Sequence, residues 1–186
     1  QLDSITRQRL LHGDWSVRAA GGIFNWWHRY QEVPALREIA IPIDMAYSEA
    51  KHSDSSAWAA WGFDGSRAYL LEADGYQGET PEAERRCAFF AHQYRSRYPT
   101  VPVKVLHRHN VAIDRISAQH LRAEARLPVV PVALPTRTAR EEVGRIISVH
   151  FEGGQALIPE YASWLGPWYE LHVAFPAPGT HDDWVE

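Results

Sequence analysis

Cysteine is nearly absent from this 186-residue chain, and its scarcity excludes two kinds of structure. The one cysteine, Cys87, lies between arginines and phenylalanines in the run Arg85-Arg86-Cys87-Ala88-Phe89-Phe90. A single thiol can form neither an internal disulfide nor a cysteine-based zinc cluster. We expect it to be a small core side chain on a helix.

Lysine is also scarce, because it occurs only at Lys51 and Lys104 and arginine supplies the rest of the positive charge. The formal net charge is −4. The planar guanidinium of arginine binds phosphate through two parallel hydrogen bonds. A net acidic chain can therefore still present a local phosphate-binding surface, so the overall charge does not exclude nucleic acid as a partner.

Long apolar runs are missing as well. No stretch approaches the roughly 20 apolar residues that cross a bilayer, and the N-terminus lacks the basic-then-apolar pattern of a signal peptide. We therefore expect a soluble intracellular protein. The hydrophobic content of 45% and the aromatic content of 12% are typical of a globular chain, and the length suits one sizeable core.

The order of the apolar segments predicts an α/β fold. Three strand-like segments come first, and Asp64-Gly65 forms a hairpin turn between the second and the third. A helix then begins with Thr80 as its cap and Pro81 in its first turn, and strands and helices alternate after it. This order predicts a mixed five-stranded sheet, antiparallel in its first three strands and then parallel, flanked by helices as in RNase H-like folds. The predicted strands are 38–44, 56–63, 67–73, 101–106 and 129–134, with a short segment at 155–159, and the predicted helices are 80–98, 111–126, 138–150 and 161–175.

Residues 1–37 differ from the rest. They contain a short amphipathic segment within residues 2–11, which stops at Gly13-Asp14. The chain also starts at Gln1 and not at methionine, as a fragment of a longer protein would. We therefore expect residues 1–37 to be a lead-in from an upstream domain and residues 38–186 to form the RNase H-like domain.

Acidic residues far apart in the sequence predict a metal site. Asp44 ends the strand-like run 39–43, where its oxygens would be fixed beside a loop, and Asp182-Asp183 follows His181 near the end of the chain. Carboxylates that converge in this way hold hard divalent cations. The alternatives are that Asp44 only caps the turn after its strand, and that Asp182 and Asp183 only cap a final helix.

Several stretches of the chain resemble, in the same order, the large subunit of the DNA-packaging terminases of tailed phages. The resemblance covers nearly the whole chain. The segment 7–15 with 21–24 resembles the part that joins the family's ATPase to its nuclease, and the tract 41–54 resembles the first nuclease strand and loop. Four further stretches resemble the C-terminal part of the family's nuclease: 152–159, Glu170, Phe175-Pro176 and His181-Asp182-Asp183.

The resemblance implies a metal-dependent endonuclease that cuts concatemeric double-stranded viral DNA with two Mg²⁺ or Mn²⁺ ions. It also implies an ATPase domain upstream, the terminase small subunit and the portal as partners of the full-length protein, and the host cell cytoplasm as the location. No Gly-x-x-x-x-Gly-Lys-Ser/Thr motif occurs in the sequence. This part of the protein is therefore expected to cut DNA but not to pump it.

The resemblance also implies the ligands. Asp44 would bridge both ions, and Asp183, with Asp182, would complete the site. The family usually has a second acid at the end of the fourth strand, where this chain has His107. An imidazole binds Mn²⁺ better than Mg²⁺. Three alternatives stay open: His107 is a ligand or an acid or base near the metals, Asp114 or Asp54 takes the place of the acid, or the site is weakened.

Arginines are the predicted DNA contacts. Arg137, Arg140 and Arg145 lie where a nuclease would follow DNA, and Arg108 lies beside the predicted active site. Such side chains bind phosphate without regard to base sequence, although the first three could instead form a solvated helix face. Two other functions stay open: a junction-resolving or RNase H-type nuclease, and a catalytically silent module that binds DNA or docks onto the portal.

Overall fold

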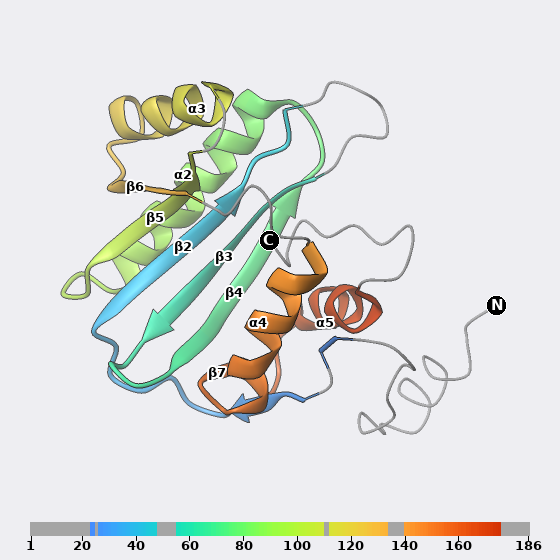
Figure 1. Ribbon diagram of the computed structural model, residues 1–186. Helices are drawn as coiled ribbons and strands as arrows, with labels where there is room; N and C mark the ends of the chain where they lie inside the picture. Colours follow the sequence, from blue (N-terminus) through green and yellow to red (C-terminus); the bar gives the residue numbers. More distant parts are fainter. Residues whose placement is uncertain (1–22, 25, 48–54, 110–111, 134–139, 176–186) are drawn as a thin grey trace.

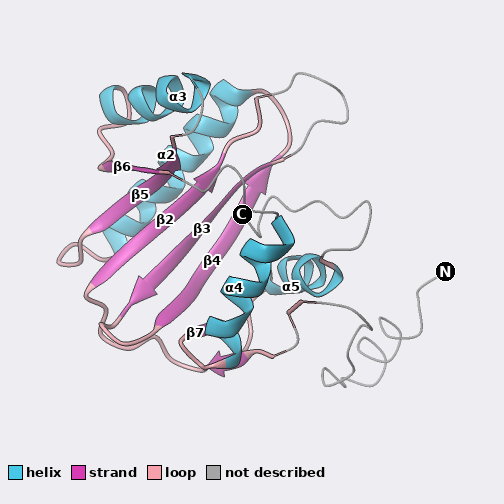
Figure 2. Ribbon diagram, viewed as in Figure 1, coloured by secondary structure: helices cyan, strands magenta, loops and turns pink. Residues whose placement is uncertain are grey.

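The protein is represented by a computed structural model, and the structure is described for residues 23–24, 26–47, 55–109, 112–133 and 140–175. Within these ranges the chain forms a seven-stranded mixed sheet with helices on both faces (Figures 1 and 2). The strand order is β1-β7-β4-β3-β2-β5-β6. The strands are β1 (His28–Tyr30), β2 (Glu38–Asp44), β3 (Ser56–Phe63), β4 (Ala68–Tyr76), β5 (Val103–Arg108), β6 (Val129–Val132) and β7 (Ala156–Pro159), and the helices are α2 (Thr80–Arg97), α3 (Ala112–Ala123), α4 (Arg140–Glu152) and α5 (Leu165–Ala174).

The middle of the sheet confirms the predicted RNase H-like arrangement. Strands β2, β3 and β4 are antiparallel neighbours, and β5 and β6 continue the sheet in parallel beyond β2. The prediction of five strands omitted β1 and left 155–159 unassigned, although β7 pairs in parallel with both β4 and β1. The strand β1 consists of His28, Arg29 and Tyr30, which have no apolar alternation, so only its pairing with β7 makes it a strand.

Two hydrophobic cores lie on opposite faces of the sheet. The first fills the space under α2 and α3, where alternate residues Ile39, Ile41 and Ile43 of β2 meet Cys87 and Leu121. The second fills the space under α4 and α5 with an aromatic cluster. Cys87 is fully buried on a helix, as predicted. Among the described helices, none combines the length and the apolar character that crossing a membrane requires.

The described part of the predicted lead-in belongs to the same structure. Phe24 is buried in the second core, where its ring meets those of Trp27, Phe151 and Phe175. Strand β1 forms an edge of the sheet. Residues within 1–37 therefore contribute to the fold that follows them, and the boundary at residue 37 stays a prediction. The predicted amphipathic segment at 2–11 lies outside the described residues.

The predicted turn between β3 and β4 is held by the carboxylate of Asp64. One oxygen accepts hydrogen bonds from the backbone N–H groups of Ser66 (2.7 Å) and Arg67 (2.8 Å), and the other accepts one from the hydroxyl of Tyr69 (2.8 Å). Gly65 has a φ of +104°, a backbone conformation that would be strained in a residue with a side chain. The backbone hydrogen bonds, and then the Tyr69 hydroxyl, hold the pKa of Asp64 well below its usual range.

This pKa predicts how the turn responds to acid. Because folding lowers the pKa of Asp64, its stabilising effect is complete above the unfolded-state pKa of about 3.9 and is lost as the pH falls toward the folded value. Asp64→Asn should therefore lower the urea midpoint clearly at pH 7 and much less at pH 2. Urea denaturation of both proteins at several pH values measures this difference. An equal loss at both pH values would show that the ionised form makes no special contribution.

Candidate active site

Asp44 is the predicted site residue that the structure places most clearly. It is the last residue of β2, a central strand between β3 and β5, and its backbone is paired with Ala57 of β3. Its side chain is 22% exposed. A carboxylate at this position has a fixed backbone and still reaches solvent, which a metal or phosphate site requires.

The chain directly after Asp44 is anchored by two neighbouring elements. The backbone N–H of Ala46 donates to the hydroxyl of buried Ser56 in β3 (3.0 Å), and the hydroxyl of Thr80 donates to the carbonyl of Ala46 (3.1 Å). Thr80 was predicted to cap α2, but Glu79 holds the cap position and the Thr80 hydroxyl bonds to this turn instead. Both polar backbone groups of Ala46 are thus satisfied, and they fix the exit of the chain from β2.

Arg108 lies beside Asp44 on the neighbouring strand. The parallel register pairs Ile43 with His107, so the next residues, Asp44 and Arg108, share the opposite face of the sheet. A guanidinium nitrogen of Arg108 donates to the Asp44 carboxylate at 2.5 Å, and both side chains are less than one-third exposed. The structure therefore brings together one predicted metal ligand and one predicted phosphate-binding residue.

His107 lies across the sheet from these two side chains. Like Val103 and Val105, it faces the first core, and it is 1% exposed. Its Nδ1 bonds to the carbonyl of Arg108 at 2.8 Å, and its Nε2 has no hydrogen-bond partner among the described residues. Burial lowers the pKa of His107, against a smaller opposite effect of the hydrogen bond to Arg108. The structure does not bring this imidazole to the Asp44 carboxylate.

Asp114, one of the alternatives for the missing acid, lies on the same side as His107. It is a buried residue of α3 and is 1% exposed. Burial, with the negative charge of Asp114 as the second cause, raises the pKa of the Tyr47 hydroxyl above its usual range. Asp114 and Tyr47 therefore belong to a cluster of buried polar side chains on the face of the sheet that carries the first core, opposite the face of Asp44. Asp54 lies outside the described residues.

The other predicted site residues are described only in part. Asp182, Asp183, His181 and Arg137 lie outside the described residues. Arg140 is the first residue of α4, which crosses the Asp44 face of the sheet and begins toward the end where β2 stops (Figure 1). Arg145 is an exposed residue of α4, 3.8 Å from the Glu141 carboxylate, so α4 carries the mixed charges of a solvated face in that region.

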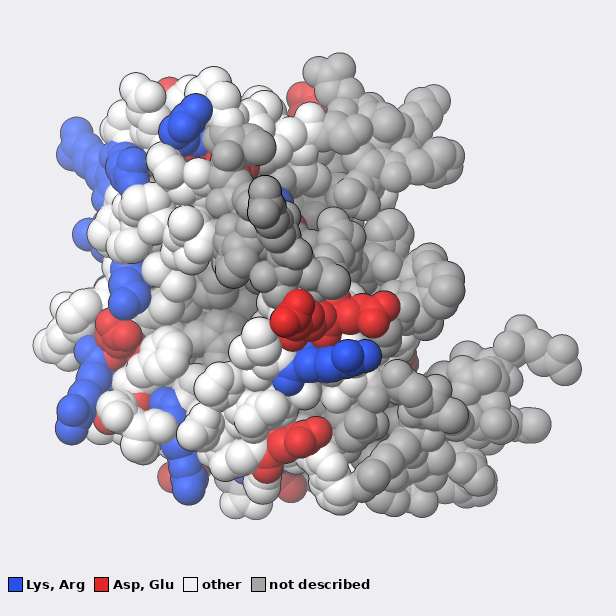
Figure 3. Space-filling model, in the orientation of Figure 1, with Lys and Arg blue, Asp and Glu red and all other residues white. Residues whose placement is uncertain are grey.

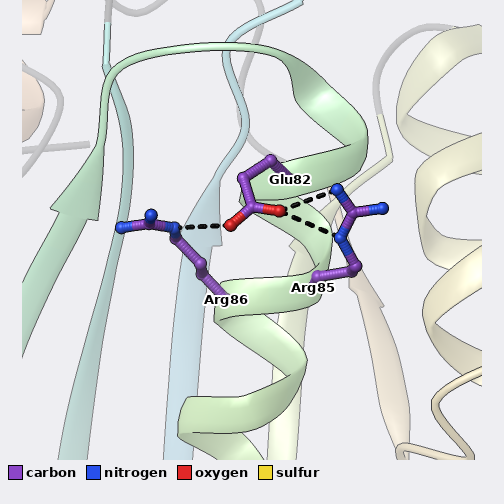
Figure 4. A network of polar contacts seen from close by, with 3 residues as sticks. All are labelled: Glu82, Arg85 and Arg86. Atoms are coloured by element: carbon purple, nitrogen blue, oxygen red, sulfur yellow. Dashed lines mark hydrogen bonds and ion pairs between the residues drawn. The ribbon is translucent and has the colours of Figure 1, made fainter.

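Two arginines near the start of α2 already have partners. Glu82 accepts hydrogen bonds from Arg85 at 2.7 and 2.9 Å and from Arg86 at 2.9 Å (Figure 4). The guanidinium of Arg86 also lies 4.2 Å from the centre of the Tyr76 ring. These exposed pairs contribute little to stability, but they reduce the positive charge that α2 offers to a phosphate. They also belong to α2, which covers the first core, whereas Arg108 shares a face of the sheet with Asp44.

The described residues supply only part of a metal site. They contain no group of three histidine, cysteine, aspartate or glutamate side chains that could hold an ion. Asp44 offers hard carboxylate oxygens that suit Mg²⁺ or Mn²⁺, while Arg108 places a positive charge against them. Asp44 therefore fits a divalent cation only if further acids join it, and the candidates from the sequence are Asp182 and Asp183.

The face of the sheet that Arg108 occupies could have been found from the sequence. Val103 and Val105 alternate with Lys104 and Leu106, and this period of two assigns His107 to the buried face and Arg108 to the face of Asp44. The hydrogen bonds of Ser56 and Thr80 to Ala46 could not be predicted from any sequence pattern of this kind. They join residues from three elements, and no local pattern predicts that meeting.

Comparisons with known proteins give a fold but no close relative. No protein family model matches the chain, and no curated protein matches it. Among solved structures, the nuclease domain of human cytomegalovirus terminase soaked with manganese is similar to this chain, with a TM-score of 0.57 and 14% identity over 83% of this chain and 84% of that domain.

Two phage proteins share the fold. The large terminase nuclease from thermophilic phage G20c, with bound magnesium, has a TM-score of 0.50 and 16% identity over 77% of each chain. The large terminase of another thermophilic bacteriophage has a TM-score of 0.51 and 10% identity over 79% of this chain. The chain spans about a third of the length of that second phage protein, matching 34% of it. These likenesses show that the chain has the fold of terminase nuclease domains.

Proposed function

We propose that this protein is the nuclease domain of a viral DNA-packaging terminase and cuts double-stranded DNA in a reaction that depends on Mg²⁺ or Mn²⁺. One observation carries the proposal: a partly exposed carboxylate is fixed at the end of a central strand, in the fold of terminase nuclease domains. Concatemers of viral DNA would be the substrate, the small subunit and portal would be partners of the full-length protein, and the host cytoplasm would be its location.

In this proposal some residues would bind the metal ions and others would bind the phosphate groups of DNA. We propose that Asp44, Asp183 and Asp182 hold two ions, which when bound would supply an activated water and stabilise the charge of the leaving oxygen. The Arg108 guanidinium, on the same face as Asp44, would bind the phosphate beside the cut. His107 would have a structural role in β5, because its side chain is buried on the face of the sheet that carries the first core. Arg137, Arg140 and Arg145 would contact the backbone farther along the DNA.

A second candidate function is a catalytically weakened module that binds DNA or docks onto the portal. Two observations favour it: the positive charge of Arg108 lies against the Asp44 carboxylate, and His107 occupies the position where the family usually has an acid. Cleavage of supercoiled plasmid with Mn²⁺ or Mg²⁺ separates the two candidates. Product that disappears with EDTA supports the nuclease, and the absence of product with both metals supports the silent module. Comparison of linear duplex, four-way junction and RNA–DNA hybrid tests the junction-resolving alternative.

Arg108 should weaken metal binding while it strengthens DNA binding. Two unit charges about 4 Å apart interact by about 1 kcal/mol in water, and the interaction with a divalent ion is about twice as large. Arg108→Gln should therefore raise the affinity for Mn²⁺ about 3- to 30-fold and lower the affinity for duplex DNA. Calorimetry with Mn²⁺ and fluorescence anisotropy with DNA measure the two effects.

The matched control is Arg97→Gln, which removes the same charge from the last turn of α2. It should leave Mn²⁺ affinity unchanged. Unaltered Mn²⁺ affinity in Arg108→Gln would mean that the ion does not bind at Asp44.

A further inference from the structure

A pocket far from Asp44 remains without a role in the proposed reaction. It has a volume of about 750 Å³, within the usual range for ligand sites, and it lies where the β3–β4 hairpin meets the end of α4. Its lining includes the aromatic side chains of Trp61, Phe63 and Phe151. Two arginines, Arg37 and Arg67, belong to the same lining. The combination of aromatic and guanidinium groups is the one that binds unpaired nucleotides.

The positive charge of the pocket is available to a ligand. No ion pair among the described residues involves the guanidinium of Arg37 or of Arg67. Both residues are exposed. Among the described residues of the lining, the one carboxylate is that of Glu38, and it is paired with Lys104 at 2.9 Å. An anionic group would therefore meet two cations, and the Glu38 carboxylate in the lining already has a cationic partner.

The hairpin holds Arg37 in place. A methyl group on Gly65 would stand 2.8 Å from the Cζ atom of Arg37, so the glycine leaves room for the guanidinium against the turn. The backbone N–H of Arg37 also donates to the carbonyl of Phe63 at 2.6 Å. The neighbouring carboxylate of Asp64 is occupied by hydrogen bonds within its own hairpin. The arginine side of the pocket thus rests on a fixed turn.

The pocket and Asp44 lie along the same face of the sheet. Side chains of β2 alternate, so Glu38 at the pocket and Asp44 share one face, and Trp61 joins it through its pairing with Ala40. The six residue steps from Glu38 to Asp44 separate them by about 20 Å at about 3.3 Å per residue. This length corresponds to about six base pairs at about 3.4 Å each.

On the face shown in Figure 3, most lysine and arginine atoms lie along the left side and lower left, and acidic atoms gather over α4.

We infer that this pocket binds one unpaired nucleotide, with its base against Trp61 and Phe63 and its phosphate between Arg37 and Arg67. The nucleotide can be free or can belong to the frayed end of a duplex whose backbone reaches Asp44. The second source rests on the proposed function, and the first does not. The pocket would then hold a DNA end about six base pairs from the cutting site.

A titration followed by NMR tests the pocket directly. Deoxyadenosine monophosphate, inorganic phosphate and deoxyadenosine are added separately to ¹⁵N-labelled protein without metal. The nucleotide should shift the backbone amides of Gly65, Ser66 and Arg67 and the indole N–H of Trp61, at concentrations at least tenfold lower than phosphate or nucleoside alone. Equal effects of phosphate alone, or no shifts at these residues, would overturn the inference.

Variants decide between the two sources and separate this inference from the nuclease proposal. The double variant Arg37→Gln/Arg67→Gln should weaken nucleotide binding at least tenfold, and Arg97→Gln should not change it. In an Asp44→Asn background, a duplex with an unpaired tail should bind more tightly than a blunt duplex, and the double variant should remove the difference. Equal binding of both duplexes limits the pocket to free nucleotides. Nucleotide binding without metal-dependent cleavage in the wild type would refute only the nuclease.

Discussion

Asp44→Asn should abolish the metal-dependent cleavage of plasmid DNA while the protein stays folded. The substitution keeps the shape of the side chain and removes the negative charge that would hold a divalent ion. Groups that only support metal ligands contribute about 10- to 100-fold to affinity or activity, so loss of a ligand itself should reduce the cleavage rate more than about 100-fold. Initial rates with Mn²⁺, beside circular dichroism and thermal unfolding of both proteins, measure the effect.

Two controls give this experiment its meaning. Glu124→Gln removes a carboxylate just after α3, away from Asp44, and should leave the rate unchanged. Asp183→Asn should abolish cleavage as Asp44→Asn does, whereas His107→Ala should reduce it less, since its imidazole lies on the other face of the sheet. Full activity of Asp44→Asn would remove the centre of the proposed mechanism.

Phe24→Ala should destabilise the whole domain. Phe24 is 3% exposed, and its ring lies 5.7 Å from that of Trp27, 6.0 Å from that of Phe151 and 5.3 Å from that of His172. Truncation of a buried phenylalanine costs about 3–5 kcal/mol because it removes apolar contacts and leaves a cavity. For a chain of this size the melting temperature should fall by roughly 6–20 °C. Differential scanning calorimetry measures this change.

The matched control is Val33→Ala in the same segment. Val33 is 38% exposed, so its truncation should change the free energy of unfolding by about 0.5 kcal/mol or less. If Phe24→Ala were equally mild, the segment before β2 would not share the core of the domain. A single calorimetric transition in both variants would in turn support one cooperative unit.

Much of the fold was predictable because its signals are local. The alternation of Ile39, Ile41 and Ile43 predicted β2 with the bounds that the structure shows, and Asp64-Gly65 predicted the turn between β3 and β4. The strand β1 was not predictable in this way. Its residues are polar, and they form a strand because the buried strand β7 offers them a hydrogen-bonding edge.

The candidate site was predicted less evenly. Asp44 stood out as an acid at the end of an apolar strand, and the structure places it at the end of β2 on a face of the sheet that Arg108 shares. The relation between Arg108 and His107 depends on the pleat of β5, which turns consecutive side chains to opposite faces. Asp182, Asp183 and Arg137 lie outside the described residues, so their roles stay predictions.

The amino-acid sequence by itself determined the kinds and order of the central elements, because hydrophobic period, turn residues and helix starts act over a few neighbouring positions. Only the tertiary structure decided which charges meet. Asp44 and Arg108 are 64 positions apart, and the pocket joins Arg37, Trp61 and His150 from separate segments. Such contacts follow from strand register and from the packing of helices on the sheet, which involve the whole chain at once.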